Sequence, residues 1–535
     1  MATFSLNGKQ VDAPDGMNLI EAAKLHGVEI PHYCYHPGLS VAGNCRMCLC
    51  EVEGARGPQI ACAQQVKDGL VVRTDTPAVE KMRKGVQEFL LLNHPIDCPI
   101  CDQAGECRLQ DYYMEYGKYD NRSDVNKVQK EKALDIGPMV VLDQERCILC
   151  TRCVRFCEEI SDSHELIVSG RGDTSVIETF PGKQLDNPYS GNVVDVCPVG
   201  ALTSKDFRFK MRVWFMKTVK SVCTGCSRGC NVLLDYKDEV AYRYRPRANA
   251  HVNGHWMCDA GRLSYKAIHE NRLSHVSIRG QQAPFMDALR EVSGLMLGDR
   301  PADAYAVVGS PFSSLEANQA LLALAARFMP GVTRLAWDST AAGPQDDFLR
   351  EADQSPNRAG VRYLGFDGSR QALLQALQGG RLQVLFILNN DLAQDAEVAE
   401  ALRKVPVRIY LGAHTNATSA LATHVLPVAT HAEQYGSFIN FQGRLQRFFQ
   451  AFEAPGDAVP EWELLSRIGR ELDRTFGWAD VEEVWADLRA AHAELASLSW
   501  YGIPDEGFQI PSLGDVQAAP LGVGRGRALA TSSSH

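Results

Sequence analysis

The residues in this sequence best suited to chemistry are its cysteines. There are 17 of them in 535 residues, the first at Cys34 and the last at Cys258. In a reducing cytosol, closely spaced cysteines indicate metal binding or catalysis rather than structural disulfides. The sequence therefore predicts a metal-rich front part, followed by a back part that contains no cysteine.

The most informative spacing lies in CILCTRCVRFC at residues 147–157. Three cysteines so spaced can bind three irons of one [4Fe–4S] cluster, and a distant Cys-Pro normally binds the fourth. The segment VVDVCPVGAL provides that Cys-Pro. We therefore predict a [4Fe–4S] cluster on these cysteines, the third set in chain order: Cys147, Cys150, Cys153 and Cys197.

Cys157 ends the same segment and has no evident partner. In a two-cluster ferredoxin the corresponding cysteine serves the second cluster. The other ligands of that cluster would stand four, seven and ten residues before Cys197, and those positions are not cysteines. We therefore expect Cys157 to be a small buried hydrophobic residue.

The first set lies in CYHPGLSVAGNCRMCLC and a later AC, and comprises Cys34, Cys45, Cys48 and Cys62. Gly38 and Gly43 allow backbone N–H groups of this loop to turn toward sulfur, which suits an iron–sulfur cluster. The spacing differs from that of plant-type ferredoxins, so a [2Fe–2S] cluster and a zinc ion both remain open. We expect Cys50, just beyond the set, to lie in a strand core.

The second set lies in LLNHPIDCPICDQAGEC and comprises His94, Cys98, Cys101 and Cys107. A lone histidine is usually structural, but three cysteines without a nearby fourth favour His94 as the remaining ligand of a [4Fe–4S] cluster. Neutral imidazole removes one negative charge, so we expect a raised reduction potential. The alternative is a zinc site of the Cys₃His type.

The fourth set lies in CTGCSRGC and a later CDAGR, and comprises Cys223, Cys226, Cys230 and Cys258. Between the third and fourth of these, residues 232–246 alternate like two strands around a turn. Cysteine pairs on hairpins also form zinc ribbons, so the pattern leaves an iron–sulfur cluster and a zinc ion open.

Short elements must position these loops. Asn7-Gly8 between TFSL and KQVDA is a strong hairpin signal, and LIEAAKLHG at residues 19–27 has helical spacing. A hairpin, a helix and then a cysteine loop is how a plant-type ferredoxin begins. A second helix is predicted at residues 77–92, with Thr76 placed to cap it.

Taken together, the sets closely resemble, in type and order, the cluster motifs of the large iron–sulfur subunit of NADH:quinone oxidoreductase, respiratory complex I. The resemblance spans residues 1–270 and is carried by CYHPGLSVAGNCRMC, NHPIDCPICDQAGEC, ERCILCTRCVRF, VVDVCPVGAL and CTGCSRGCN. It implies one [2Fe–2S] cluster on the first set and three [4Fe–4S] clusters on the others. It also implies that the fourth cluster lies off the main electron path, as a relic or a structural staple.

The resemblance further implies an electron-relay subunit of the peripheral arm that has no complete active site and no catalytic residue of its own. Electrons would enter from the NADH and flavin module and leave toward quinone. The expected partners are the flavin/NADH-binding subunit, the small [2Fe–2S] subunit and the iron–sulfur subunits of the quinone module.

Four arginines stand next to candidate ligands: Arg46, Arg108, Arg152 and Arg155. They could stabilise reduced, more negative clusters, but surface arginines that only interact with water are equally expected. Two other functions stay open. One is a relay subunit of a soluble NAD-linked hydrogenase or formate dehydrogenase, and the other is a zinc-stabilised scaffold without redox activity.

The back part alternates apolar strands with amphipathic helices. YAVVGS at 305–310, VLFILNN at 384–390 and VRIYLG at 407–412 each precede a helical pattern, which predicts a parallel α/β sheet covered on both faces. Residues 423–446 resemble a segment of molybdopterin oxidoreductases. We nevertheless expect a cofactor-free scaffold without molybdenum, because no cysteine follows Cys258 and the chain leaves no evident room for a last pterin-binding domain.

The expected architecture is multidomain, α+β and then α/β. The predicted divisions are a β-grasp [2Fe–2S] ferredoxin-like domain at 1–76, a His-Cys₃ [4Fe–4S] segment at 77–120, a [4Fe–4S] ferredoxin-like domain at 137–215, a molybdopterin-oxidoreductase-type [4Fe–4S] domain at 216–270, a molybdopterin-oxidoreductase-like α/β domain at 271–520 and a disordered tail at 521–535.

Composition and charge narrow the class of protein. A hydrophobic content of 45% and a charged content of 22% are typical of a soluble globular protein, and the net charge of -10 argues against nucleic-acid binding. No apolar run approaches the ~20 residues of a membrane span, and the N-terminus has no signal-peptide pattern. We therefore expect a cytoplasmic protein. The resemblance to complex I further implies a peripheral position on the cytoplasmic face of the bacterial inner membrane, with membrane contact only through the complex.

Overall fold

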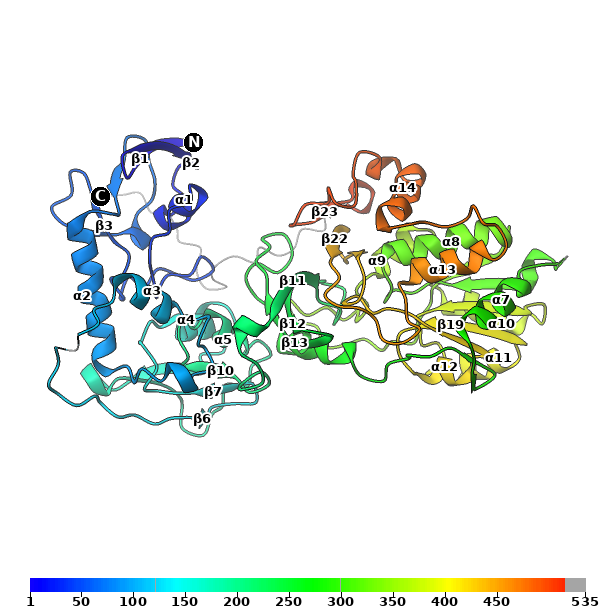
Figure 1. Ribbon diagram of the computed structural model, residues 1–535, viewed down its shortest axis with the longest axis horizontal. Helices are drawn as coiled ribbons and strands as arrows, with labels where there is room; N and C mark the ends of the chain where they lie inside the picture. Colours follow the sequence, from blue (N-terminus) through cyan, green and yellow to red (C-terminus); the bar gives the residue numbers. More distant parts are fainter. Residues whose placement is uncertain (121, 299, 515–535) are drawn as a thin grey trace. The chain divides into compact units, whose positions relative to one another are not determined.

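A computed structural model describes residues 1–514 except residues 121 and 299 (Figure 1). Its residues form two compact units, the first being Met1–Met216 and the second beginning at Lys217. The predicted disordered tail at 521–535 lies outside the described residues. Among the described residues, none of the helices has both the length and the apolar composition that a membrane crossing requires.

The front unit begins with a five-stranded sheet in the order β2-β1-β5-β3-β4. Its strands are β1 (Ala2–Leu6), β2 (Lys9–Ala13), β3 (Leu49–Val52), β4 (Gln59–Ile60) and β5 (Val71–Arg73). Asn7 and Gly8 have φ values of 52° and 80°, the left-handed backbone that a tight hairpin turn requires. Phe4 and Val72 of the sheet pack in one hydrophobic core with Leu19 of α1 (Leu19–Leu25), so the predicted hairpin and helix are confirmed.

The rest of the front unit consists of short helices and small sheets. The helices are α2 (Pro77–Asn93), α3 (Arg108–Tyr116), α4 (Arg152–Glu159) and α5 (Asn192–Val196). The sheets are β10-β7-β6, from β6 (Leu134–Asp135), β7 (Val140–Leu142) and β10 (Leu202–Ser204), and the hairpin of β8 (Leu166–Ser169) with β9 (Val176–Thr179). Thr76 caps α2 as predicted, because its Oγ1 accepts a 3.2 Å hydrogen bond from the Val79 amide.

The back unit opens with an antiparallel sheet, β11-β12-β13, and the helix α6. Their bounds are β11 (Lys217–Val222), β12 (Asn231–Lys237), β13 (Val240–Pro246) and α6 (Asp259–Leu263). The two strands predicted between the cysteines of the fourth set are therefore confirmed as β12 and β13. A second antiparallel sheet, β21-β22-β23, is formed by β21 (Gly436–Ile439), β22 (Arg444–Phe448) and β23 (Phe508–Gln509).

A seven-stranded sheet in the order β15-β14-β20-β19-β18-β16-β17 forms the centre of the back unit. Its strands are β14 (Ser277–Ile278), β15 (Gln281–Gln282), β16 (Tyr305–Val308), β17 (Thr333–Leu335), β18 (Val384–Leu388), β19 (Val407–Gly412) and β20 (His424–Pro427). The neighbouring strands β20, β19, β18, β16 and β17 are all parallel, as the strand–helix alternation predicts.

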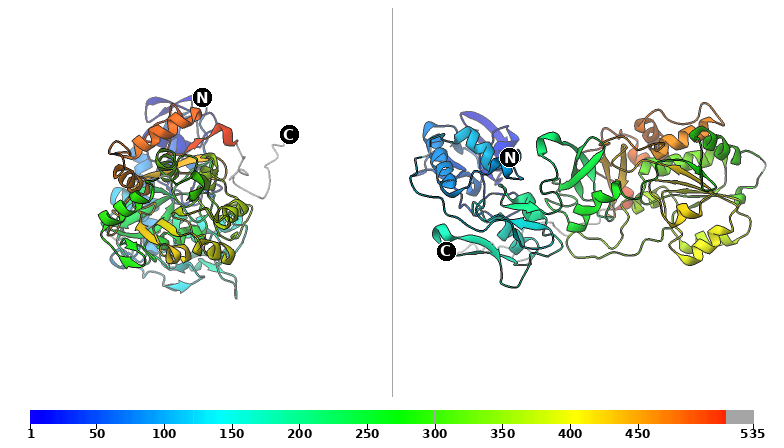
Figure 2. Two further views of the ribbon diagram at one scale, coloured as in Figure 1. Left: turned by 90° about the vertical axis from the view of Figure 1, so that its right-hand side faces the viewer. Right: turned by 60° about the horizontal axis from the view of Figure 1, so that its bottom comes forward.

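Helices cover both faces of this sheet (Figures 1 and 2). Their bounds are α7 (Phe285–Leu295), α8 (Leu315–Phe328), α9 (Arg358–Tyr363), α10 (Arg370–Gln378), α11 (Ala396–Arg403), α12 (Ala417–Leu421), α13 (Glu461–Arg470) and α14 (Val481–Ala491). Successive residues of each strand enter different cores. Val307 and Phe386 pack with α7, α8, α13 and α14, whereas Val308 and Leu385 pack with α10 and α11.

Candidate metal centres

The four cysteines of the first set converge beside the N-terminal sheet. Hydrogen bonds from Cys45 and Cys62 lower the pKa of Cys34 far below its usual value, and a hydrogen bond from Cys62 lowers the pKa of Cys48. The thiols therefore contact one another in the series Cys45–Cys34–Cys62–Cys48. Cys50 belongs to β3 and to the hydrophobic core of this sheet, in agreement with the expected strand-core position.

Three members of the second set, His94, Cys98 and Cys107, line a cavity of about 420 Å³. His94 follows the last residue of α2, and its Nδ1 is buried without a hydrogen-bond partner. Burial lowers the pKa of His94 to about 4, so the imidazole is neutral at physiological pH. A neutral imidazole with an unused nitrogen is suited to metal ligation.

Cys101 does not line this cavity and lies instead against Gly200. A Cβ on Gly200 would stand 2.2 Å from the Cys101 Sγ, far inside van der Waals contact. Glycine at position 200 therefore provides the space that Cys101 occupies. The spacing of the cysteines did not predict a role for Gly200. Its position three residues after Cys197 was the one signal in the sequence that could have suggested it.

We expect Gly200→Ala to displace Cys101 and to reduce the occupancy of the second cluster site, with loss of up to about four irons per chain. Electron paramagnetic resonance of the reduced protein would measure the signal of that cluster against the others. Gly57→Ala is the matched control, because nothing lies within 4 Å of a Cβ at Gly57. An unchanged second cluster in the Gly200 variant would contradict the prediction.

The third set lines one small apolar cavity of about 20 Å³. Cys147, Cys150 and Cys153 reach it from the start of α4 and the loop before it, and Cys197 reaches it from the end of α5. The Leu149 amide donates a 3.4 Å hydrogen bond to the Cys147 Sγ, from a backbone with φ of 52°.

Cys157 lies on α4 and is fully buried, but it does not line this cavity. Burial raises the pKa of its thiol to about 12, so it is protonated and weakly nucleophilic at neutral pH. Its surroundings agree with the expected role as a small buried hydrophobic residue.

The fourth set lines a cavity of about 260 Å³ in the back unit. Cys223 follows β11, Cys230 precedes β12 and Cys258 caps α6, so the hairpin and the helix bring the cysteines together. The Gly261 amide donates a 3.2 Å hydrogen bond to the Cys258 Sγ. A Cβ on Gly261 would lie 3.1 Å from the Cys223 Sγ, so any side chain there would be in tight contact with that thiol.

The ligands of the four sets are chemically suited to iron–sulfur clusters, since each set supplies soft thiol ligands in a largely buried pocket. Burial raises the pKa of Cys147, Cys197 and Cys223 to about 12 each, so iron must displace protons on binding. A single zinc ion instead needs all its donors about 2.0–2.3 Å from one point. Within the described part of the chain, no three histidine, cysteine or acidic side chains are grouped to hold one metal ion.

One hydrophobic core contains cysteines of all three front sets. These are Cys34 and Cys45 of the first set, Cys107 of the second, and Cys147, Cys150 and Cys197 of the third. Tyr33, Met47 and Leu109 fill the space among them. Packing of the front unit thus brings together ligands that are more than a hundred residues apart in the chain.

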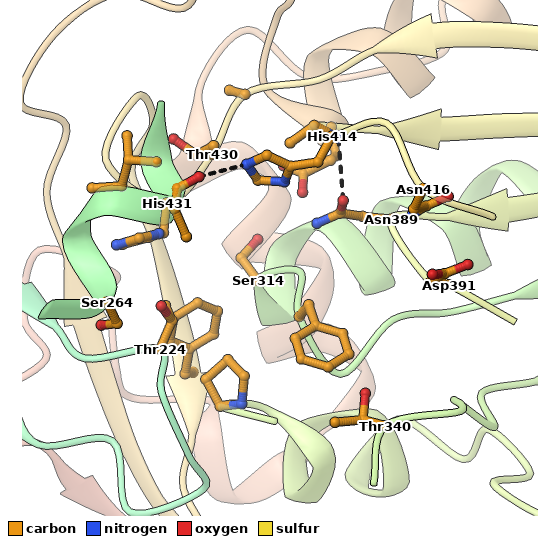
Figure 3. A pocket seen from close by; sticks show the side chains of 18 of the residues that line it. Thr224, Ser264, Ser314, Thr340, Asn389, Asp391, His414, Asn416, Thr430 and His431 are labelled. Carbon is orange, nitrogen blue, oxygen red and sulfur yellow. Dashed lines mark hydrogen bonds between the residues drawn. The ribbon is translucent and has the colours of Figure 1, made fainter. Parts of the chain in front are cut away.

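A further cavity of about 430 Å³ lies at the carboxyl ends of the parallel strands (Figure 3). Asn389 and Asp391 follow β18, His414 follows β19, and His431 follows β20. Ser314, which caps α8, also lines the cavity and lies near the centre of the view shown. β17 lies on one side of β16, and the next strand of the chain, β18, lies on the other side, so the direction of the sheet reverses at β16. Ligands of open α/β sheets bind at the carboxyl ends of the strands at such a reversal point.

The side chains of this cavity are polar, and several of them are hydrogen-bonded within the protein. The Thr430 Oγ1 and the Gln434 Oε1 are buried and have no hydrogen-bond partner among the described residues. The His414 Nε2 lies 2.9 Å from the Ala267 carbonyl, and the Asp391 Oδ1 accepts hydrogen bonds from both the amide and the hydroxyl of Thr418. Among the described residues that line it there is no cysteine, lysine or arginine.

Five family models match the chain in sequence order. They are a 2Fe-2S iron-sulfur cluster binding domain at 1–77, the NADH-ubiquinone oxidoreductase-G iron-sulfur binding region at 83–122, the ferredoxin-like domain of NADH-quinone oxidoreductase subunit 3 at 137–203, the molybdopterin oxidoreductase Fe4S4 domain at 216–270 and molybdopterin oxidoreductase at 304–471.

Curated relatives carry corresponding names. An NADH-quinone oxidoreductase subunit of Rickettsia conorii is 40% identical over 321 residues, which cover 59% of this chain and 48% of the relative. A mitochondrial NADH dehydrogenase [ubiquinone] iron-sulfur protein 1 of Solanum tuberosum is 42% identical over 322 residues, 59% of this chain and 43% of the relative. The chain is a homologue of these iron–sulfur subunits. The mitochondrial 78 kDa subunit of NADH-ubiquinone oxidoreductase from Neurospora crassa is 43% identical over 297 residues, 54% of this chain and 40% of the relative.

The resemblance to the large iron–sulfur subunit of complex I and the predicted fold class are therefore confirmed, and the chain contains 2Fe-2S and 4Fe-4S binding domains. It spans about half the length of the curated relatives that it matches. A chain in the crystal structure of an NAD+-reducing [NiFe]-hydrogenase is 30% identical and covers 40% of this chain and 91% of its own. Its TM-score of 0.35 is too low to support an argument about the fold.

Proposed function

We propose that this homologue is an electron-relay subunit of the peripheral arm of NADH:quinone oxidoreductase. The observation that carries the proposal is the single hydrophobic core that holds cysteines of the first, second and third sets. Electron tunnelling weakens steeply with distance, so a relay needs its redox centres packed closely in a dry interior. A zinc-stabilised scaffold has no such requirement.

Hydrogen bonds connect the third set to both the first and the second. Arg155 donates hydrogen bonds to the carbonyls of Cys34 and Cys150, which belong to the first and third sets. The Arg108 amide, next to Cys107, donates a 3.0 Å hydrogen bond to the Pro198 carbonyl, next to Cys197. The third set therefore contacts both of the others, and we propose the series first set, third set, second set as the electron path.

We propose the following ligands: Cys34, Cys45, Cys48 and Cys62 for one [2Fe–2S] cluster, and His94, Cys98, Cys101 and Cys107, then Cys147, Cys150, Cys153 and Cys197, then Cys223, Cys226, Cys230 and Cys258 for three [4Fe–4S] clusters. The clusters, when bound, supply the one-electron chemistry. The chain's own residues bind them, exclude water and set their environment.

The back unit is proposed to be a scaffold that stabilises the fourth cluster site and holds no molybdenum. Its strand-end cavity contains no cysteine among the described residues, and Asp391 is already engaged by Thr418. The absence of lysine and arginine from that lining also makes it a poor site for a polyanionic cofactor.

The proposed partners are the flavin/NADH-binding subunit, the small [2Fe–2S] subunit and the iron–sulfur subunits of the quinone module. The proposed location is the cytoplasmic face of the bacterial inner membrane. Affinity purification of the tagged chain from membranes should recover these subunits together. Recovery of hydrogenase or formate dehydrogenase subunits instead would favour a relay in one of those soluble enzymes.

Elemental analysis of the anaerobically purified chain is the direct test. We expect about 14 irons per chain, negligible zinc and no molybdenum. About ten irons with one zinc would mean that one cubane assignment is wrong, and the fourth set would be the first to re-examine. Stoichiometric molybdenum would overturn the scaffold role of the back unit.

A further inference from the structure

Two buried arginines of α4 lie between the first and third ligand sets. Arg152 and Arg155 are 9% and 8% exposed, although arginine is almost never buried without a charged partner. Both belong to the helix that begins directly after Thr151, which follows Cys150. Arg46 and Arg108 also adjoin candidate ligands but are exposed, so neighbourhood in sequence does not explain the burial.

Arg155 ties the two ligand sets through their backbone. Its Nη2 donates a 2.6 Å hydrogen bond to the carbonyl of Cys34 and a 3.3 Å hydrogen bond to the carbonyl of Cys150. Its Nη1 donates to the carbonyl of Ser40, in the loop that connects Cys34 to the rest of the first set. One guanidinium thus contacts the main chain of a ligand from each set.

Arg152 makes a second, independent connection. Its Nη1 donates a 3.1 Å hydrogen bond to the carbonyl of Val196, the residue before Cys197, and its Nη2 donates to the carbonyl of Tyr35, the residue after Cys34. Its Nε is buried and has no hydrogen-bond partner within the described residues. We call these two side chains the guanidinium bridge.

The guanidinium bridge has no protein counter-charge. Within the described residues, neither guanidinium has a carboxylate oxygen within 4.0 Å, and all acceptors except the Thr151 hydroxyl are neutral carbonyls. Two other buried arginines are paired with carboxylates, since Arg146 lies 3.0 Å from Asp97 and Arg228 lies 2.6 Å from Glu351. Buried Arg83 instead contacts the ring and hydroxyl of Tyr116. An unpaired buried cation is costly, so a negative charge must approach from elsewhere.

We infer that the guanidinium bridge is the shared counter-charge of the first and third cluster sites, and that it raises the reduction potentials of both clusters. This rests on the proposed function, because the negative charge is that of the two clusters with their thiolates. Each reduction adds one negative charge near both guanidinium groups, and a buried cation stabilises the reduced form. Arg152 and Arg155 are positioning residues, since Arg155 contacts the main chain of Cys34 and Cys150, and Arg152 contacts that of Tyr35 and Val196 beside the ligands.

The test is a redox titration of the purified holoprotein, followed by electron paramagnetic resonance, which separates the first and third clusters by their spectra. The variants are Arg155→Gln, Arg152→Gln, the charge-retaining Arg155→Lys and Arg152→Lys, and the control Arg46→Gln. Arg46 adjoins Cys45 but is exposed, so water and salt screen its charge. Iron content is measured in every sample.

In each glutamine variant of the bridge we expect both potentials to fall, with about a tenfold change in the reduced-to-oxidised ratio at a fixed potential, which is 59 mV for one electron. Arg155→Lys should retain most of the wild-type potential, and Arg46→Gln should leave both unchanged. If a glutamine variant of the bridge loses a cluster, the lysine variant at the same position, Arg155→Lys or Arg152→Lys, decides: restored signals support the inference and absent signals overturn it.

The inference would also be overturned if the glutamine variants of the bridge kept both cluster signals and their reduction potentials shifted no more than in Arg46→Gln. Failure of the proposed function is distinguishable from this result. In that case the wild-type protein itself would lack iron and the two signals.

Discussion

Cys197→Ala is expected to remove one [4Fe–4S] cluster and to interrupt electron transfer, whereas Cys157→Ala is expected to retain every cluster. Cys197 lines the cavity of the third set together with Cys147, Cys150 and Cys153, and Cys157 does not. A cubane that loses one thiolate exposes an iron to water. In the proposed electron path the third set stands between the first and second, so its loss is expected to break the series.

The two cysteine variants form a matched pair, since each removes one thiol from the same subdomain, from half-buried Cys197 or from buried Cys157. Iron should fall by about four of about fourteen atoms in Cys197→Ala and stay unchanged in Cys157→Ala. Reduction of a quinone analogue by NADH in the assembled complex should fall to background only in the former. The reverse pattern of iron loss would show that Cys157 is the true fourth ligand.

His94→Cys is expected to retain the second cluster and to lower its reduction potential, by an amount on the order of 100 mV. The thiolate adds a negative charge to the cluster where the neutral imidazole adds none, and the oxidised form is therefore favoured. The prediction is based on two observations. The Nδ1 of His94 has no hydrogen-bond partner, and His94 lines the same cavity as Cys98 and Cys107.

The measurement is a redox titration of the His94→Cys protein, with the other three clusters as internal references. His94→Ala should lose the second cluster or leave it unstable, since no fourth ligand remains. If His94→Ala retained the cluster with an unchanged potential, His94 would be a structural histidine, and the fourth ligand would have to be sought elsewhere.

Much of the fold could be predicted from local patterns. The hairpin at Asn7-Gly8 and the helix capped by Thr76 depend on interactions between residues a few positions apart, which a sequence displays directly. The strands β16, β18 and β19 appear as short apolar runs because both faces of a parallel sheet are buried. The sheet order and the two cores depend on packing between distant segments, and no local pattern contains that information.

The candidate sites divide in the same way. The spacing of Cys147, Cys150 and Cys153 is a local motif. The intervals between cysteines, together with one histidine, were enough to predict all four candidate ligand sets. The space that Gly200 leaves for Cys101 could not be derived, because the two residues are far apart in the chain and meet only in the packed unit.

The four arginines beside the ligands show where sequence information ends. Arg46, Arg108, Arg152 and Arg155 are the same residue type in the same kind of position, and the sequence by itself determined only that each stands close to a candidate ligand. Tertiary structure decided that the first two are exposed, and that the last two are buried among carbonyls of both sets. The physical reason is that burial depends on which distant segments pack around a side chain, whereas ligand chemistry depends on the side chain itself.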